Sequence, residues 1–385
     1  MVKAMLRGLL VVSLILNTVM FCTPAKADSN APYKIGGIFS ITGYLSWLGQ
    51  INKQGAELEV ELINKAGGIN GHPLELVWYD DKSSPEEASR VAQRLINKDR
   101  GVALMGTSTT PNSGAVAAVA NRTKVPLIVA SGYAVDPAKD PWVFNAVHST
   151  DYAVTQGFQY FQKKGLVKLA LLMPMGPLGD QGTKVANKYA GEYGIEIIGN
   201  ERFDVKSPDV TPQLAKIRAM DPQAIFSFCT GQPAALLARN MHQLGMAMPI
   251  LVSHGNATPG FLKLIEGLNT MILVPSGKIM KPEAIADSDP SKKIIMQYSK
   301  IYEEKYGQAP DYFVGMSADS VALLAEGLRK AGNADPQKLL TAIENIREFP
   351  RMQGVFNMSP EDHYGTKATD MILLTPKNGK WEIAE

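Results

Sequence analysis

The sequence predicts an α/β protein whose chain forms two successive parallel-sheet units, and three observations carry this prediction. From residue 33 onward, short apolar runs alternate with amphipathic stretches, which is the pattern of repeated βαβ units. A second series of the same kind begins near His148. At 385 residues, the chain is long enough for two domains with substantial cores.

The first series opens with a strand at 33–39 and a helix at 49–66. Ala56, Val60 and Ile63 fall on one face of this helix, at spacings of four and three. The other expected elements of the series are strand 74–79, helix 85–98, strand 101–105, helix 112–122, strand 125–130 and strand 142–147.

The second series repeats this architecture without evident sequence identity. Its expected elements are helix 152–164, strand 167–173, helix 180–193, strand 195–199, helix 211–220, strand 224–228, helix 233–244, strand 249–253, helix 259–268 and strand 271–275. Helices at 291–306, 317–331 and 336–346 follow, and the pattern alone does not place them. The last expected strands are 355–357, 371–375 and 381–384, of which the last two flank Asn378-Gly379 and predict a hairpin.

The N-terminus has the features of a signal peptide. Lys3 and Arg7 precede an apolar run at 8–21, and Ala25-Lys26-Ala27 has the small-x-small pattern of a cleavage site. We therefore expect residues 1–27 to be removed and the protein to be exported and soluble. A lipoprotein signal at Cys22 is the weaker alternative, because bulky Phe21 precedes that cysteine.

Composition and motifs exclude several classes of function. The net charge is +2 with scattered lysines and arginines, which predicts no nucleic-acid partner. Segment 176–182 lacks the spacing of a dinucleotide loop and the Lys-Ser/Thr pair of a P-loop. The sequence contains no G-x-S-x-G elbow, H-E-x-x-H motif or cysteine cluster. We therefore predict a protein that is not an enzyme, with no cofactor and no metal site.

The first candidate site consists of two polar turns that follow the strands at 101–105 and 125–130. In a parallel sheet, ligands bind outside the carboxyl ends of strands, where backbone N–H groups and helix N-termini face outward. Two neighbouring hydroxyl-rich turns would hold a carboxylate there. The alternative interpretation is that the serines and threonines only cap the next helices. The candidate residues are Ser108, Thr109, Ser131, Gly132 and Tyr133.

The second series offers fewer polar candidates. His254 and Asn256 follow the apolar strand at 249–253, so we expect them at the ligand-facing edge of their sheet. A loop histidine bonded to backbone is the alternative. Asp151 and His148 flank the point where one series gives way to the next, and Asp151 could also cap the helix at 152–164.

Several segments together resemble a known family. They are IGGIFSITGYLSWLGQ (35–50), GAELEVELINKAGGINGHPLELVWYDDKSSPEEA (55–88), MGTSTTPNSGAVA (105–117), VPLIVASGYA (125–134) and GDQG (179–182). The chain from 33 to 385 resembles the substrate-binding proteins of ABC importers of the leucine/isoleucine/valine type, which have the type I periplasmic binding fold.

The resemblance implies two doubly wound parallel-sheet lobes joined by a three-segment hinge, which close on a solute. The expected lobes are 28–147 with 277–353, and 148–276 with 354–385. The resemblance also implies a periplasmic monomer that docks on the membrane permease of an ABC importer.

The resemblance assigns roles to some residues and marks departures at others. Ser108 or Thr109 and Ser131 to Tyr133 match the turns that hold the solute carboxylate, and Asp151 matches an acid at the lobe junction. His254 stands where family members that bind aliphatic amino acids place a glutamate for the α-ammonium.

Other departures concern the lining of the site. Pocket aromatics of those members correspond here to Leu48, Leu178 and Gly231, whereas Trp47 and Tyr133 are new aromatics nearby. We expect Trp47, Leu178 and Gln232 to line the site. Two classes of solute stay open: a branched-chain or other hydrophobic amino acid, and an aromatic or aliphatic carboxylic acid. A ligand-sensing receptor subunit is the alternative role.

Overall fold

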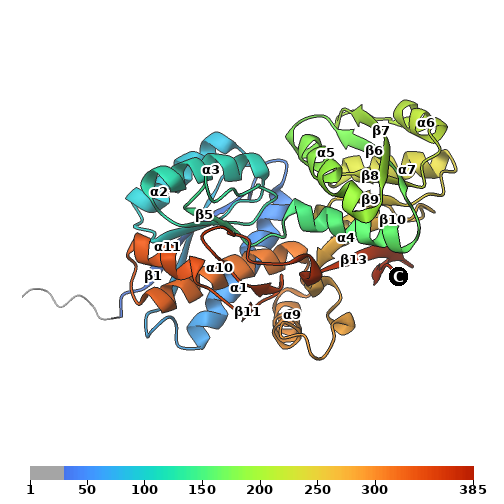
Figure 1. The fold of residues 1–385 in the computed structure, drawn as a ribbon. Helices are drawn as coiled ribbons and strands as arrows, with labels where there is room; N and C mark the ends of the chain where they lie inside the picture. Colours follow the sequence, from blue (N-terminus) through green and yellow to red (C-terminus); the bar gives the residue numbers. More distant parts are fainter. Residues whose placement is uncertain (1–29) are drawn as a thin grey trace, which may run out of the picture.

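The computed structural model describes residues 30–385, and its two large sheets lie side by side with helices around each (Figure 1). We call each sheet with its covering helices a unit. The predicted signal peptide, residues 1–27, lies outside the described residues. None of the helices in the described part combines the length and apolar character needed to cross a bilayer.

The first unit is built on five parallel strands in the order β2-β1-β3-β4-β5. Its strands are β1 (Tyr33–Phe39), β2 (Leu74–Asp80), β3 (Ala103–Gly106), β4 (Leu127–Val129) and β5 (Val143–Asn145). Apolar side chains of α2 (Pro85–Asn97) and α3 (Thr110–Thr123) pack on one face. Those of α1 (Ser46–Lys65), α10 (Tyr312–Ala331) and α11 (Pro336–Glu344) pack on the other. Helix α9 (Lys292–Tyr306) packs outside α1 and α10.

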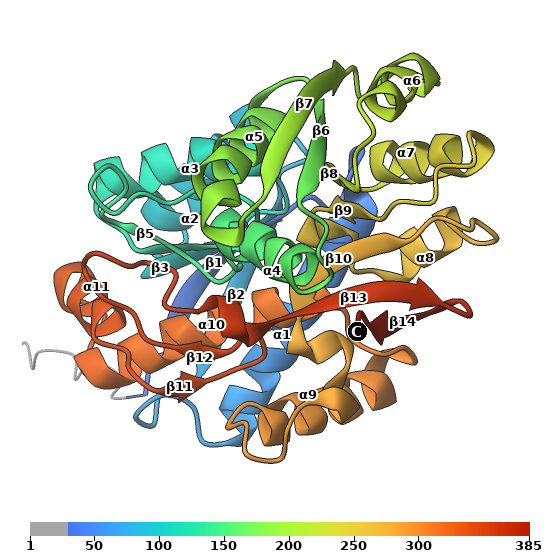
Figure 2. The same ribbon diagram turned by 45° about the vertical axis from the view of Figure 1, so that its right-hand side comes forward.

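The second unit contains seven strands in the order β14-β13-β10-β9-β8-β6-β7. They are β6 (Lys168–Pro174), β7 (Glu196–Phe203), β8 (Ala224–Ser227), β9 (Ile250–Val252), β10 (Ile272–Gly277), β13 (Met371–Lys377) and β14 (Lys380–Ile383). The first five are parallel, and the β13–β14 hairpin joins β10 antiparallel at the edge (Figure 2). Helices α4 (Thr150–Lys163) and α5 (Pro177–Tyr189) cover one face. Helices α6 (Thr211–Ala219), α7 (Gln232–Gln243) and α8 (Pro259–Leu264) cover the other.

The parallel strands of both units follow one doubly wound order, because β6 to β10 repeat the 2-1-3-4-5 arrangement of β1 to β5. The predicted fold class is confirmed. In such sheets the chain winds in opposite directions from the first strand, and a crevice opens at the carboxyl ends beside this switch point. The fold therefore directs attention to the turns after β1, β3 and β4, and to those after β6, β8 and β9.

The predicted helices and strands are all found in the structure, with shifted ends. Helix α10 shows a large shift, since it begins at Tyr312 rather than at 317. The Asp311 carboxylate accepts hydrogen bonds from Phe313 N and Val314 N, and so caps the helix five residues earlier than expected. A short strand, β11 (Phe349–Pro350), pairs with β12 (Val355–Phe356) and was not expected.

The last crossing between the units lies further along the chain than predicted. Phe356 and Met358 are buried in the core of the first unit, and Asn145 N donates to His363 O at 2.9 Å. Residues 354–366 therefore pack with the first unit, which corrects their placement in the second lobe. We propose that the lobe boundary lies near residue 367.

A buried ionic cluster holds the segment that leads into this crossing. Arg351 Nη2 lies 2.7 Å from Glu59 Oε1 on α1, and Arg351 Nε lies 3.1 Å from Asp319 Oδ1 on α10. Asp319 also accepts hydrogen bonds from Met352 N and Gln353 N. Burial raises the pKa of Asp319 to about 6, although the Arg351 charge opposes this rise.

Candidate functional site

The turns after β1 and β3 meet at the switch point of the first sheet. Ser40 N donates to Ser108 Oγ at 3.4 Å, and Ser40 Oγ donates to Asp81 Oδ1 at 2.6 Å. Ser108 is 6% exposed, whereas Ser40 and Asp81 are fully buried. Ser108 therefore lies at the position where a doubly wound sheet binds its ligand, and Asp81 lies one layer below it.

Five hydroxyl side chains gather at the carboxyl ends of β3 and β4, and we call them the hydroxyl cluster: Thr107, Ser108, Thr109, Ser113 and Ser131. Ser113 Oγ lies 2.8 Å from Thr107 Oγ1 and 2.7 Å from Ser131 Oγ, so it joins the two turns. All five residues are buried. The structure brings the two predicted polar turns together, and Ser113 of α3 is the link that sequence reasoning missed.

The two central hydroxyls differ in their local role. Thr109 caps α3, because its Oγ1 accepts a hydrogen bond from Asn112 N at 3.1 Å. The capping interpretation is therefore correct for Thr109, while Ser108 accepts only the long bond from Ser40 N. A hydroxyl that accepts one N–H keeps its proton for donation. Both groups can therefore donate to a carboxylate placed at the N-terminus of α3, where the helix dipole favours negative charge.

Tyr133 does not direct its ring to the hydroxyl cluster. Its hydroxyl donates to Asp140 Oδ2 at 3.1 Å, and its ring packs against Gly114 of α3. Burial and the Asp140 charge raise the pKa of Tyr133 to about 12. Only the backbone of Tyr133 faces the turn, since its N–H donates to Ser131 Oγ. The Tyr133 side chain is thus engaged by Asp140 and α3, and its contact with a solute stays a prediction.

Gly132 has no packing requirement of its own. A Cβ atom at this position would lie 3.6 Å from Thr110 Oγ1, which is an ordinary contact. The neighbouring protein atoms thus leave space beside the backbone of this turn.

His254 lies at the corresponding edge of the second unit, in the turn after β9. Its side chain is 6% exposed, and its ring centroid lies 5.8 Å from that of Tyr312 and 5.9 Å from that of Phe228. Its Nδ1 atom is buried without a hydrogen-bond partner among residues 30–385. Burial lowers the pKa of His254 to about 4, so the imidazole is neutral at pH 7.

Tyr312 connects this histidine to the first unit. Its hydroxyl lies 3.2 Å from His148 Nδ1, and His148 is also neutral, because burial and then His254 lower its pKa to about 3. Upstream, Asn145 Nδ2 donates to Ser131 O at 3.2 Å. Asn145 therefore contacts the hydroxyl cluster, and three residues further along the chain His148 contacts Tyr312, whose ring lies beside His254.

Aromatic rings extend this connection into a wall, which we define as Trp47, Phe313, Tyr312, His254 and Phe228. Successive ring centroids are 6.0 Å apart for Trp47–Phe313, 5.9 Å for Phe313–Tyr312, 5.8 Å for Tyr312–His254 and 5.9 Å for His254–Phe228. Trp47 lies at the start of α1 and is 46% exposed. The wall spans both units, and Trp47 is its exposed end, whereas the other four side chains are buried.

Asp151 is engaged within its own unit. Its Oδ1 accepts hydrogen bonds from Lys188 Nζ at 2.7 Å and from Tyr189 Oη at 2.8 Å, both on α5. Ser149 rather than Asp151 caps α4, since its hydroxyl accepts from Tyr152 N. The structure therefore rules out Asp151 as the cap of α4 and shows its carboxylate paired with α5.

The remaining second-unit candidates are peripheral to the aromatic wall. Leu178 packs half-buried against the core beneath α4 and α5. Gln232 is exposed at the first position of α7. Asn256 is fully buried, and its amide accepts from Gly231 N and donates to Cys229 O. Asn256 therefore fixes the turns after β8 and β9, which leaves His254 as the predicted residue that contacts the wall.

The described residues contain no group of three or more histidine, cysteine or acidic side chains that could hold a metal ion. Asp80 and Asp81 both accept backbone N–H groups of nearby turns, and Ser84 caps α2 in their place. Cys229 is fully buried, and burial raises the pKa of its thiol to about 12.

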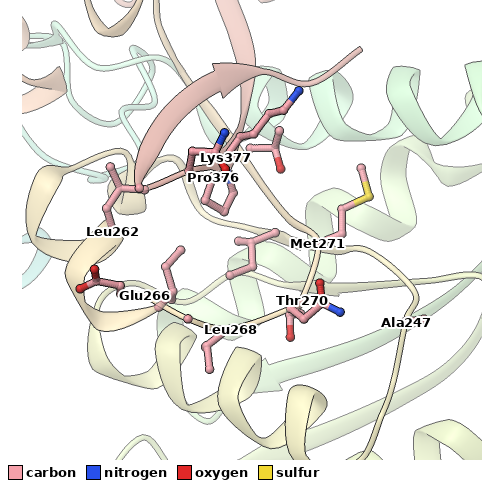
Figure 3. A pocket seen from close by; sticks show the side chains of 15 residues that line it. Ala247, Leu262, Glu266, Leu268, Thr270, Met271, Pro376 and Lys377 are labelled. Atoms are coloured by element: carbon pink, nitrogen blue, oxygen red, sulfur yellow. The ribbon is translucent and has the colours of Figure 1, made fainter.

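A cavity of about 690 Å³ lies elsewhere in the molecule, at the end of the second sheet where β9 and β10 begin (Figure 3). Its lining includes Ala247, Leu262, Glu266, Thr270 and Lys377. None of the ten predicted site residues lines it. Because ligands of doubly wound sheets bind at the carboxyl ends, we do not assign the site to this cavity.

Tyr312, Phe313 and His148 are the residues that sequence reasoning missed or left out of the site. The signal for the first two was present, because Asp311 followed by an apolar triplet is a helix start that brings both rings to the first turn. No comparable local signal marks His148, whose partner lies 164 residues away in the chain.

The chain is similar to known proteins over most of its length. A family model described as periplasmic binding protein matches residues 32–380. The leucine-, isoleucine-, valine-, threonine- and alanine-binding protein of Pseudomonas aeruginosa is 24% identical over 322 residues, covering 80% of this chain and 82% of the relative.

Solved structures agree with this similarity. An extracellular ligand-binding receptor from Rhodopseudomonas palustris has a TM-score of 0.83 at 27% identity, covering 92% of this chain and 100% of the other. The branched-chain amino acid transporter substrate-binding protein of Streptococcus pneumoniae, solved in complex with isoleucine, has a TM-score of 0.78 at 24% identity. That similarity covers 92% of this chain and 99% of the other.

Proposed function

The chain belongs to the periplasmic binding protein family, and from this premise we propose that it is the solute-binding component of an ABC importer. The family and the relatives named above are binding proteins rather than enzymes, as the sequence predicts. We propose an importer of the branched-chain or hydrophobic amino acid type, in which the protein traps a small carboxylate-bearing solute between its two lobes.

The hydroxyl cluster is the observation that carries this proposal. The Ser108 and Thr109 hydroxyls belong to the turn that leads into α3, and Ser113 links this turn to Ser131, which precedes Gly132. Charge-assisted hydrogen bonds to a carboxylate are roughly twice as strong as those between neutral groups. The site is thus suited to hold an anionic group in a fixed orientation.

The arrangement of the units supports a closing mechanism. The chain passes between the sheets three times, after β5, after β10 and before β13, so the units are joined by short segments. A solute that touches both units binds the closed form better than the open form and shifts the equilibrium toward it. The closed protein would then dock on the membrane permease.

The family also supports a periplasmic location for this protein. We propose that residues 1–27 direct export and are cleaved near Ala27, and that the mature protein works as a monomer.

Thermal unfolding in the presence of a solute panel tests the proposal. The mature protein is heated with hydrophobic amino acids, with aliphatic and aromatic carboxylic acids, and with the corresponding amides as uncharged controls. A solute at 100 times its Kd should add about 2.7 kcal/mol to the free energy of unfolding. Stabilisation by at least one carboxylate and not by its amide is expected. A panel in which amides stabilise as well as acids would contradict the proposal.

A ligand-sensing receptor subunit is the second candidate, favoured by the similarity to the extracellular ligand-binding receptor from Rhodopseudomonas palustris. The two roles differ in what a cell loses with the protein. An importer component is required for uptake of the radiolabelled solute. A sensor is required for the response to that solute, whereas uptake persists without it.

A further inference from the structure

We propose that the solute is an aromatic monocarboxylate that carries no ammonium group. This inference rests on the proposed function, because it names the class of solute held by the same site. Three features of the described residues support it: the neutral groups on the second unit, the engagement of the nearby acids, and the aromatic wall.

The second unit presents neutral groups where a zwitterionic solute needs a negative charge. His254 is a buried imidazole, and Asp151 is paired with Lys188 and Tyr189. A neutral imidazole can accept one hydrogen bond from an ammonium group but supplies no compensating charge. Burying an ammonium without a paired carboxylate costs several kcal/mol, which is more than one such hydrogen bond returns.

The acids of the first unit do not fill this role either. Asp81 is fully buried below Ser40 and accepts from Ser40 Oγ and Ser83 N. Asp140 accepts hydrogen bonds from the Tyr133 hydroxyl and from Asn121 Nδ2 of α3. Asp311 caps α10 with bonds to two backbone N–H groups. Asp81 and Asp140 are thus committed to partners within the first unit, and Asp311 is committed to capping the backbone of α10 beside Phe313.

The histidines that flank Tyr312 reinforce the neutral character of this region. His148 and His254 approach the same tyrosine from the two units, and each has one ring nitrogen buried without a partner in the described chain. A nearby cation could donate one hydrogen bond to a neutral ring nitrogen but would receive no compensating negative charge. An uncharged body that offers a hydroxyl or an aromatic edge suits these nitrogens without a charge penalty.

The aromatic wall favours a ring as that body. Its successive rings meet at angles of 83°, 72° and 69°, which are edge-to-face, and at 51° for the tilted last pair. An additional ring can pack edge-to-face or offset against Trp47, the exposed end of the wall, which contributes about 0.5–1.5 kcal/mol beyond area burial for each aromatic pair. An aliphatic side chain gains only the free energy of burying its apolar surface.

Calorimetric titration with four probes tests the inference on the mature protein. The probes are 3-phenylpropanoate, L-phenylalanine, 4-methylpentanoate and L-leucine, which form two pairs that differ only in the α-ammonium group. We expect 3-phenylpropanoate to bind at least 100-fold more tightly than L-phenylalanine and about tenfold more tightly than 4-methylpentanoate. If either amino acid binds as tightly as its ammonium-free counterpart or more tightly, the inference that the solute lacks an ammonium group is wrong. If 4-methylpentanoate binds more tightly than 3-phenylpropanoate, the inference that the solute is aromatic is wrong.

Substitution of His254 tests which residue sets this preference. His254→Glu supplies a carboxylate at the wall and should narrow the ratio between 3-phenylpropanoate and L-phenylalanine at least tenfold. His254→Gln stays neutral and should keep the ratio within threefold of the original. A ratio that is unchanged in His254→Glu contradicts the assignment, and the titrations of the unaltered protein test the inference even where a variant folds poorly.

The inference can fail while the proposed function stands. If an amino acid binds best and Ser108→Ala weakens that binding, the site is a carboxylate trap for a zwitterion, and only the inference is overturned. If none of the four probes binds, the inference is overturned as well. The wider panel with its amide controls then decides the proposed function separately.

Discussion

The carboxyl edges of the two sheets occupy equivalent places in one topology, yet they carry opposite chemistry. The edge of the first unit displays the hydroxyl cluster beside the N-terminus of α3. The edge of the second unit displays His254 and Phe228, which belong to the aromatic wall. The shared strand order gives the two edges equivalent positions, and the residues of the turns give them different chemistry; under our proposal, each edge would hold a different group of the solute.

This difference extends below the surface of each edge. The first unit buries charged groups, among them Arg351, Glu59 and Asp319, and pairs them with one another. In the wall region, burial keeps His254 and the neighbouring His148 uncharged at pH 7. The comparison suggests a division of labour, in which one unit orients an anion and the other selects the body attached to it.

Removing the central cation of the first unit should have the largest effect. Arg351→Met leaves Glu59 and Asp319 buried without their partner, which we expect to lower the free energy of unfolding by about 3–5 kcal/mol. Chemical denaturation measures this loss. The matched control is Lys216→Met in the second unit, where the lysine is 64% exposed and a loss below about 1 kcal/mol is expected. Similar losses in the two variants would contradict a special role for buried charge in the first unit.

Deleting one hydroxyl at each edge should change the Kd for the solute at the first edge and not at the second. Ser108→Ala removes a donor to a charged carboxylate and should cost about 1.5–3 kcal/mol, or roughly 10- to 100-fold in Kd. Ser227→Ala removes the buried hydroxyl at the end of β8, which is the counterpart of β3, and should leave Kd within twofold. Calorimetry with the best carboxylate of the panel gives both values. If Ser227→Ala weakens binding as much as Ser108→Ala does, the two edges do not differ in how they hold the carboxylate.

The pH dependence of stability should reveal the neutral state of the wall. The pKa of His254 is about 4 in the folded protein, against an ordinary value of 6.5. Between these values the unfolded chain binds the proton and the folded chain does not, so stability falls as the pH falls below about 6.5. Asp311 and Asp319, whose pKa values are raised to about 6, contribute in the opposite direction.

A variant isolates the histidine from these acids. Between pH 7.5 and pH 5.0, the unaltered protein should lose about 2 kcal/mol more stability than His254→Gln does. Denaturation curves at the two pH values measure this difference. Parallel pH profiles for the two proteins would mean that His254 is accessible enough to be protonated in the folded state.

The smallest effect is expected at Asp151, which the structure places on α4 and pairs with α5. Asp151→Asn should leave Kd within twofold, because the carboxylate does not face the wall. The free energy of unfolding should fall by less than about 1 kcal/mol, because the Lys188 side chain of the pair is 58% exposed. A tenfold or larger loss of affinity would return Asp151 to the site and weaken the case for a solute without an ammonium group.

The sequence predicted the first edge better than the second. The serines and threonines after β3 and β4 are local to their strands, so periodicity and turn composition were enough to place Ser108, Thr109 and Ser131. Tyr133 and Asp151 were predicted as contacts because they sit in the right turns, but their side chains have partners elsewhere. The Tyr133 hydroxyl bonds to Asp140 and the Asp151 carboxylate bonds to Lys188, and no local sequence pattern reveals these hydrogen bonds.

By itself, the sequence determined the α/β alternation, the two series and the hairpin at the end, because each depends on neighbours within a few residues. Only the tertiary structure decided that Tyr312 meets His148 and His254, and that residues 354–366 return to the first unit. These contacts join segments more than 50 residues apart, and their partners are chosen by shape and burial. The physical reason is that side-chain packing depends on contacts across the whole chain, whereas helices, strands and caps depend on residues close in sequence.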